Sequence, residues 1–554
     1  MIKDKKSSKI LSIIVFCVIL FLSTVFRFAC IEKVDGLWYD ELVMFNQANQ
    51  SNILKTIVYS LATDVHLPLY QVLLHLWAKI FNFSDVSLRS FSAVTGVLTV
   101  CIGYFIGSSF KSKFQSFLTM LLFATNSFLV YYSQEVRMYE LLAFFSALNL
   151  LFLIRLNRSK RDALLWILST LGLVFTYTIS IIYVVIEIVG YSIYKQNFKN
   201  KRWVKIGTLF FVFVTPILAP YFIFSGKRVA TFVTGFYADW SSLFVVLQNF
   251  FTPKLVGIGN NPIHYLEQFV KNFSFYDFVF VVVPIVIACY FIFRAVKEDK
   301  FARIVFTISI GFVLVEVLAF IFTDFKILSR YLIIILPNLL ALIAMGAKDY
   351  KNKFFLSLIS IFLLLNFAYL AYSPRASYKS GRDGYLPIVK MMQENNIQDN
   401  DIVFVWNRKE VLTKYLDKKV TVLSVLGDIA YKSEYVFANK NKLDNSDTEA
   451  KKEILKDYFA LKIPAENTEI LMTFVISRMK PEQKVILLTN RYFDDFTSDE
   501  FYRQVENKDT FDVFTFNNLM TAKATLDLKY ICNHSLKKVD TYEKGFYVLQ
   551  IWKK

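Results

Sequence analysis

The sequence predicts a polytopic α-helical membrane protein with an α/β domain at its C-terminal end. Of its 554 residues 55% are hydrophobic and only 19% are charged, which is far more apolar than a soluble globular chain. Apolar runs long enough to cross a bilayer recur up to Tyr372, and a polar, charged segment follows. We therefore expect a membrane domain at 1–372 and a second domain at 373–554.

The basic residues predict which way the chain crosses the membrane. The formal net charge is +18, but Lys and Arg lie in short clusters between apolar runs, so we expect membrane anchoring and no nucleic-acid partner. The cluster from Lys3 to Lys9 keeps the N-terminus cytoplasmic. About eleven spans follow, at residues 10–29, 88–107, 114–131, 138–154, 163–177, 180–194, 207–224, 276–293, 302–322, 332–345 and 354–371. We therefore expect a multi-pass protein of the cell membrane. An odd number of spans places its C-terminal domain on the side opposite to the cytoplasm.

The segment from Leu69 to Phe83 predicts a helix lying in the membrane interface. Gln71, His75 and Lys79 recur every four positions on an otherwise apolar helix that Pro68 begins. If this helix lies flat, each later basic cluster falls on the cytoplasmic side. The tail should form a small α/β domain, with strands near 401–406, 420–425, 484–489 and 545–551.

Two adjacent carboxylates, Asp40 and Glu41, follow the first span and are expected on the outer side. A carboxylate held at a bilayer surface is costly, so catalysis, cation binding or pairing with Arg would explain it. Asp40 suits a general base, and Glu41 would orient it or bind a cation. The alternative is structural: Asp40 would cap the following helix and Glu41 would favour its dipole.

Three arginines are candidate anion-binding residues on the same side. Arg137 and Arg330 lie at or near the membrane surface, and a guanidinium group binds phosphate bidentately. Arg89, near the outer end of its helix, is a weaker candidate. Glu135 could pair with Arg137. Alternatively, each arginine could extend its charged group to the membrane–water interface without binding an anion.

His66 and His264 are both expected outside, where either could join Glu41 in holding a divalent metal. Their spacing shows no paired metal ligands, so ordinary loop histidines are the alternative. Glu187 and Glu316 fall inside spans, which would be costly at mid-bilayer. They indicate either an ion pathway or side chains that face the bundle interior.

The order of several short motifs resembles the bacterial branch of the protein O-mannosyltransferase-like family of GT-C membrane glycosyltransferases. These motifs are Asp40-Glu41, His66-Leu-Pro68-Leu-Tyr70, Leu88-Arg89-Ser-Phe-Ser, Gln134-Glu135-Val-Arg137-Met-Tyr139 and Arg330-Tyr331 with Pro337. The resemblance implies transfer of one sugar from a polyprenyl-phosphate carrier to an acceptor hydroxyl on the outer face.

The resemblance also implies roles for individual residues. Asp40 would be the catalytic base, and Glu41 would shape the pocket or hold a metal. Arg137, Arg330 and Tyr331, with Arg89, would face the donor phosphate, while the pocket would include His66, Tyr70, Glu135, Tyr139 and His264. The chain departs from the family at Leu67, where members often have Pro, and at Ile179, where many have His.

The expected reaction is an inverting displacement, since the clamped phosphate is a good leaving group and Asp40 deprotonates the acceptor. The acceptor would be a cell-envelope glycan, a lipid or a protein. Two other functions stay open: a membrane transporter or flippase, which needs no base, and a polysaccharide polymerase or ligase that uses a diphosphate-linked donor.

Overall fold

The computed structural model describes residues 2–29, 31–32, 36–110, 112–156, 158–195, 209, 239–256, 264–322, 327–349, 351–372, 386–395, 397–405, 414–416, 420–424, 472, 476–490, 513–544 and 547–554. The chain divides into two compact units. The helical unit comprises residues 1–33 and 40–382, and the C-terminal unit comprises residues 34–39 and 383–554.

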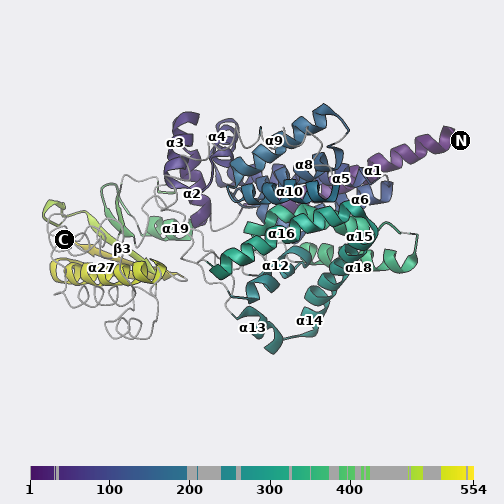
Figure 1. The fold of residues 1–554 in the computed structure, drawn as a ribbon. Coiled ribbons are helices and arrows are strands. Elements are labelled where there is room, and N and C mark those ends of the chain that lie inside the picture. The colour runs from purple at the N-terminus through teal and green to yellow at the C-terminus, as the bar shows by residue number, and fades with distance from the viewer. Residues whose placement is uncertain are drawn as a thin grey trace. The chain divides into compact units, whose positions relative to one another are not determined.

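The helical unit is built from a long series of helices (Figure 1). They are α1 (Ile2–Phe28), α2 (Tyr39–Ala48), α3 (Ile53–Thr63), α4 (Leu69–Phe81), α5 (Asp85–Ser108), α6 (Lys113–Thr125), α7 (Ser127–Tyr132), α8 (Tyr139–Arg155), α9 (Lys160–Thr176), α10 (Ser180–Lys195), α12 (Ser241–Phe251), α13 (Tyr265–Lys271), α14 (Phe275–Asp277), η1 (Phe278–Val282), α15 (Val283–Glu298), α16 (Lys300–Phe322), η2 (Tyr331–Ile335), α17 (Leu336–Gly346) and α18 (Lys353–Tyr372).

Helices occupy the expected spans wherever the structure describes them. Within the described residues, five are long and apolar enough to cross a bilayer: 9–28, 85–108, 275–298, 300–322 and 353–371. The expected span 207–224 lies outside the described residues, so the number eleven stays a prediction. The segment expected at 114–131 is two helices, because the backbone is extended at Asn126, which caps α7 by accepting the Leu129 N–H.

Glycines allow α5 and α6 to pack closely. A methyl group at Gly107 would lie 2.7 Å from the Ser116 Cα atom, and one at Gly103 would lie 3.1 Å from the Phe123 ring. Small residues of this kind let membrane helices approach until their backbones nearly touch. The close pair α5–α6 packs against α1.

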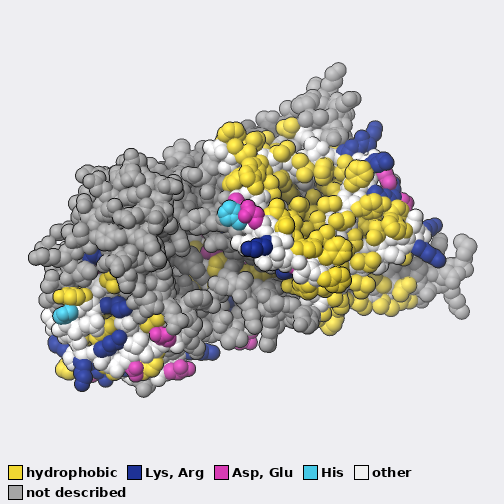
Figure 2. Space-filling view, turned by 90° about the horizontal axis from the view of Figure 1, so that it is seen from below, with side chains coloured by type: hydrophobic (Ala, Val, Ile, Leu, Met, Phe, Trp, Pro, Cys, Tyr) yellow, Lys and Arg dark blue, Asp and Glu magenta, His cyan; other side chains and the backbone are white. Residues whose placement is uncertain are grey.

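Basic residues group at one end of these helices. Arg155, the last residue of α8, donates to Ser109 Oγ and Phe105 O, both at 3.4 Å, at the C-terminal end of α5. At the ends of α15 and α17, Arg294 binds Asp349 and Lys348 lies 2.9 Å from Glu298. In Figure 2 most of the Lys and Arg around a broad hydrophobic face of the helical unit lie at one end of it, and a smaller basic patch lies at the other end. Exposed apolar surface of this extent is typical of lipid contact.

The short helices α3 and α4 have 11 and 13 residues, too few to cross a bilayer. Two residues of the polar stripe of α4, Gln71 and His75, are buried, whereas Lys79 is exposed. Gln71 binds Gln47 and Asp64, while His75 Nδ1 lies 2.8 Å from the carbonyl oxygen of Ala48. Apolar side chains of α4 are exposed instead, with Ile80 at 75%. The helix thus buries Gln71 and His75 against α2 and α3.

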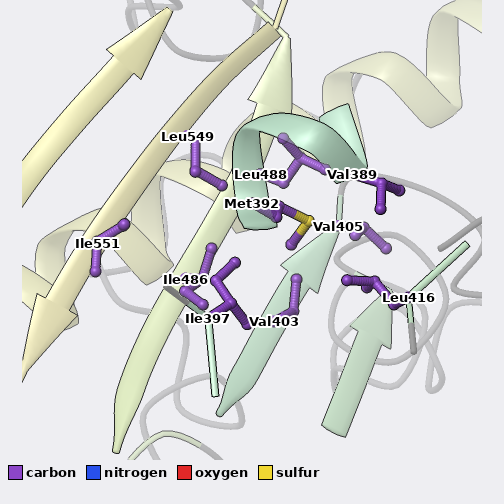
Figure 3. Close-up of a cluster of buried hydrophobic side chains, with 10 residues drawn as sticks. All are labelled: Val389, Met392, Ile397, Val403, Val405, Leu416, Ile486, Leu488, Leu549 and Ile551. Carbon is purple, nitrogen blue, oxygen red and sulfur yellow. The ribbon is translucent and has the colours of Figure 1, made fainter. Parts of the chain in front are cut away.

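The C-terminal unit contains α19 (Leu386–Glu394), β1 (Ile402–Val405), β2 (Thr421–Ser424), β3 (Lys484–Asn490), α27 (Val513–Ser535), β4 (Lys537–Lys544) and β5 (Tyr547–Lys553). The sheet order is β2-β1-β3-β5-β4. Strands β2, β1 and β3 are parallel, whereas β5 is antiparallel to both of its neighbours. Figure 3 shows apolar side chains of α19 packed against β1, β3 and β5.

This sheet confirms the expected α/β character of the tail. The four expected strands correspond to β1, β2, β3 and β5. Strand β4 was not expected, because its sequence from Lys537 to Lys544 is almost wholly polar. It forms because it pairs with β5 at the exposed edge, where polar side chains cost little and Lys protects against further pairing.

Candidate active site

A buried ion pair lies at the centre of the candidate site. The Arg89 guanidinium on α5 donates to both oxygens of Glu41, from Nε at 2.9 Å and from Nη2 at 2.7 Å. Both side chains are fully buried. Such a bidentate pair satisfies two charges that would otherwise be very costly away from water.

The Glu41–Arg89 pair joins four segments of the chain: α2, α5, the loop at 133–138 and Ile31 after α1. Glu41 Oε1 also accepts the backbone N–H of Val136 at 3.0 Å, and Arg89 Nη1 donates to the Ile31 carbonyl at 3.3 Å. Gln134 ties the same 133–138 loop to the end of α1 through the carbonyls of Phe26 and Ala29. The pair therefore fixes the start of α2 relative to α5 and to this loop.

Asp40 and Arg137 flank that pair and face each other. Asp40 precedes Glu41 in the first turn of α2, and Arg137 follows Val136. Asp40 Oδ2 lies 3.7 Å from Arg137 Nη2, with 24% of the Asp40 side chain and 13% of the Arg137 side chain exposed. Burial alone would lower the pKa of Arg137, but Asp40 and Tyr139 raise it above its ordinary value. Asp40 is thus a partly exposed carboxylate beside a permanent cation.

A second guanidinium lies near the same carboxylate. Arg330 is only 5% exposed, and its guanidinium carbon lies 5.5 Å from the centre of the Tyr331 ring. Arg137 makes the same kind of cation–π contact with Tyr139, also at 5.5 Å. The pKa of Arg330 is raised against its burial by Tyr139 and Tyr331 and then by Asp40. Both arginines therefore keep their charge in this buried setting.

His66 lies beside the two arginines. Asp64 Oδ1 accepts the backbone N–H groups of Val65 and His66, which shapes the loop before α4. Burial lowers the pKa of His66 to about 4; Asp64 opposes this shift, while Arg137 and Arg330 add to it. The imidazole is therefore neutral at physiological pH, and it is better suited to hydroxyl groups than to a phosphate.

The other predicted residues fall in different places. Tyr70 is buried and its hydroxyl lies 3.3 Å from Ser92 Oγ. Glu135 is buried in the 133–138 loop, and its charge acts on Arg89. Arg137 forms an ion pair with Asp40, and the expected pairing of Glu135 with Arg137 stays a prediction.

His264 is exposed and occupies the N-cap position of α13, and its ring lies near Asp239 and Glu267. Within the described part of the chain, no three His, Cys, Asp or Glu side chains come together as metal ligands. Glu41, the other predicted metal ligand, binds Arg89. The described residues thus offer no donor set on which a metal-dependent step could be based, and the predicted metal stays untested.

The two carboxyl groups inside the spans face the interior of the bundle. Glu187 is buried and accepts the Trp166 indole N–H at 2.7 Å, while Glu316 is 3% exposed. A short polar network lies nearby in the described helices, in which Asn338 donates to Tyr183 and Ser309. Bundle-facing positions explain why these groups are tolerated between apolar helices.

Sequence reasoning did not single out Tyr177, which lies in the turn between α9 and α10. Its ring centre is 4.6 Å from that of His66, 6.1 Å from that of Tyr331 and 6.4 Å from that of Tyr139. The available signal was its place next to Thr178, in a turn expected on the same side as Asp40.

Comparison with known proteins was made for the sequence and for the fold. Residues 65–220 match the family described as dolichyl-phosphate-mannose-protein mannosyltransferase. A comparison with curated protein sequences gave no match. The apo structure of ArnT from Cupriavidus metallidurans is similar with a TM-score of 0.55, at 11% identity over 99% of this chain and 98% of that one.

The chain has the GT-C membrane glycosyltransferase fold. A second ArnT structure from the same organism, bound to undecaprenyl phosphate, matches with a TM-score of 0.52, at 10% identity over 98% of each chain. AglB from Archaeoglobus fulgidus, an archaeal oligosaccharyltransferase, matches with a TM-score of 0.49, at 9% identity over 98% of this chain and 74% of that one.

The GT-C fold brings most of the predicted residues to one end of the helical unit. The mannosyltransferase match covers 65–220 and so includes His66, Arg89, Arg137 and Tyr139, while Asp40, Glu41 and Arg330 lie outside it. The expected resemblance to a multi-pass GT-C membrane protein is confirmed. The roles of individual residues stay predictions.

Proposed function

We propose that this protein transfers a monosaccharide from a polyprenyl-phosphate carrier to an acceptor hydroxyl, with Asp40 as the general base. The observation that carries the proposal is a partly exposed carboxylate 3.7 Å from Arg137 and within electrostatic reach of Arg330. The GT-C fold and the bound undecaprenyl phosphate of the similar ArnT structure support a carrier of this class.

In the proposed reaction Asp40 removes the proton of the acceptor hydroxyl as its oxygen attacks the anomeric carbon of the donor. The new carbon–oxygen bond forms as the bond from the anomeric carbon to the phosphate oxygen breaks. The polyprenyl phosphate leaves with the bonding electrons, and the proton stays on Asp40 until it is released to water. A direct displacement of this kind inverts the anomeric configuration.

Arg137 and Arg330 would stabilise the charge that develops on the departing phosphate. Both lie in the surroundings of Asp40, and both hold their charge against burial. Fixed cations in a partly buried site act without a large reorganisation of solvent, so they lower the barrier effectively. Because Arg89 is bound to Glu41, we assign that pair a positioning role and not a role in phosphate binding.

The proposed site faces the side of the membrane opposite to the cytoplasm. Helix α5 runs from Arg89 in the site to Ser109, which contacts Arg155, and α8 runs from Tyr139 to Arg155 itself. The 24 residues of α5 span roughly 36 Å, enough for a bilayer. Arg155, at the C-terminal end of α8, therefore lies about one membrane thickness from the site that contains Asp40. The positive-inside rule assigns the end with Arg155 to the cytoplasm.

The test is transfer by the purified protein in detergent. A panel of polyprenyl-phosphate monosaccharides labelled in the sugar would be supplied together with membrane and cell-wall fractions as acceptors. We expect label in a product other than the donor, and a loss of at least about 100-fold in turnover for Asp40→Asn. A product with the donor's anomeric configuration would contradict direct displacement.

The same assay separates the rival functions. A transporter or flippase needs no base, so Asp40→Asn would leave its activity nearly intact. A polymerase or ligase would use a diphosphate-linked oligosaccharide and leave the monosaccharide donors untouched. Reagent labelling of Asn52→Cys and Arg158→Cys, both exposed positions, tests sidedness: the first should react from outside the cell and the second only after permeabilisation. Labelling from one and the same side would contradict the assigned orientation.

A further inference from the structure

Tyr177 connects the α9–α10 turn to the residues around Asp40. The helix α9 ends there, with the Tyr177 N–H bonded to the Leu173 carbonyl at 2.9 Å. The ring is 1% exposed and lies among the rings of His66, Tyr139 and Tyr331. Thr178 Oγ1 lies 3.5 Å from the carbonyl oxygen of Val65, so the turn also touches the loop that carries His66.

Several buried polar atoms on these two segments have no hydrogen-bond partner among the described residues. They are the hydroxyl oxygens of Thr176, Tyr177 and Ser180, and Nδ1 of His66. Roughly nine in ten or more buried polar groups in proteins are bonded, so a local concentration of unbonded ones needs an explanation. A ligand with several hydroxyl groups would satisfy them together.

The chemistry of the cluster matches a sugar better than a phosphate or a lipid chain. The aromatic faces of Tyr177 and its neighbours can cover the apolar C–H face of a sugar ring. The phenol hydroxyl and a neutral imidazole can each donate or accept a hydrogen bond, as sugar hydroxyls require. Arg137 and Arg330, the proposed phosphate-binding groups, act electrostatically on His66 and so lie beside the cluster.

We propose that Tyr177 and His66 form the subsite for the transferred sugar of the donor, next to the arginines that hold its phosphate. This inference rests on the proposed function. Tyr177 is a substrate-binding residue in this arrangement: its hydroxyl bonds a hydroxyl of the sugar, and its ring helps to orient the anomeric carbon toward the acceptor activated by Asp40.

The test compares two ligands that differ only in the sugar. Binding of unsugared polyprenyl phosphate and of a panel of polyprenyl-phosphate monosaccharides would be measured on the full chain in detergent. Tyr177→Phe removes one oxygen and keeps the ring. It should weaken binding of the sugared donor roughly tenfold, as expected for one uncharged hydrogen bond, and leave binding of unsugared polyprenyl phosphate unchanged.

Tyr183→Phe is the matched control. Tyr183 is equally buried, six residues further along the chain, and its hydroxyl accepts from Asn338 Nδ2 at 2.9 Å. This variant should bind both ligands like the wild type. Unchanged binding of polyprenyl phosphate by Tyr177→Phe also shows that the variant is folded.

The outcomes distinguish this inference from the proposed function. Suppose that the wild type binds a sugared donor, but Tyr177→Phe weakens the binding of neither ligand or of both equally. The cluster then has a structural role or holds water, and the inference is overturned. If the wild type binds no sugared carrier more tightly than polyprenyl phosphate and transfers no sugar, the proposed function itself fails and the subsite fails with it.

Discussion

Replacing Glu41 with Gln should destabilise the helical unit far more than the same kind of change at the adjacent Asp40. Glu41 accepts two hydrogen bonds from Arg89 and one from the Val136 N–H, and both charged side chains are fully buried. The Gln variant would leave the buried Arg89 charge without the Glu41 carboxylate. Breaking a buried pair in this way costs about 3–5 kcal/mol.

The neighbouring Asp40→Asn change should have the opposite profile. Asp40 is 24% exposed and its nearest cationic atom is 3.7 Å away. Pairs of this exposure contribute about 1 kcal/mol or less, so stability should hardly change. Turnover, however, should fall by at least about 100-fold because the proposed base is lost.

The two effects are measured separately. The free energy of unfolding would come from tryptophan fluorescence during SDS titration in mixed micelles, and turnover from initial rates of sugar transfer. The double variant Glu41→Leu with Arg89→Met is the control, since removing both charges avoids an uncompensated one and should recover much of the lost stability. If Glu41→Gln were as stable as the wild type, the argument that this pair fixes the site would be wrong.

Two further predictions concern stability. With a pKa of about 4 in the folded protein and 6.5 in the unfolded chain, His66 takes up its proton more readily on unfolding. The neutral His66 therefore contributes up to about 3 kcal/mol to the free energy of unfolding above pH 6.5, and this contribution is lost progressively as pH falls toward 4. The His66→Gln variant should lose less stability over that range. Parallel profiles of unfolding free energy against pH for the variant and the wild type would contradict this. A methyl group at Gly346 would lie 2.7 Å from the Phe291 carbonyl carbon, a backbone atom, so Gly346→Ala should cost about 1–3 kcal/mol or more. Gly190→Ala, where the nearest atom is a flexible Ile308 carbon at 3.2 Å, should cost clearly less in the same unfolding titration.

Much of the fold followed from the chain's apolar patterning. Long apolar runs must be helical in lipid, since every backbone hydrogen bond has to be made within the segment, and the expected spans are helices wherever they are described. The four strands expected in the tail were recognised by their β-branched and aromatic runs. Strand β4 escaped notice because its polar residues carry no such signal.

The polar residues were harder to place from sequence. The stripe of Gln71 and His75 indicated a helix with one polar face, but a periodic stripe does not say whether water or another helix lies against it. In the structure that stripe bonds to α2 and α3, while apolar residues such as Ile80 are exposed. Periodicity identifies which residues share a face of the helix. Only the packing of neighbouring helices decides whether that face contacts water, lipid or protein.

The sequence by itself determined the membrane fold, the clustering of basic residues between spans and the positions at which carboxylates and arginines occur. Only the tertiary structure decided which of them meet. Successive residues on a helix point about 100° apart, so Asp40 and Glu41 have different partners, and the partners come from segments 48 and 97 positions along the chain. Tyr177 joins them for the same reason: its ring contacts are made across helices, and nothing in its local sequence specifies them.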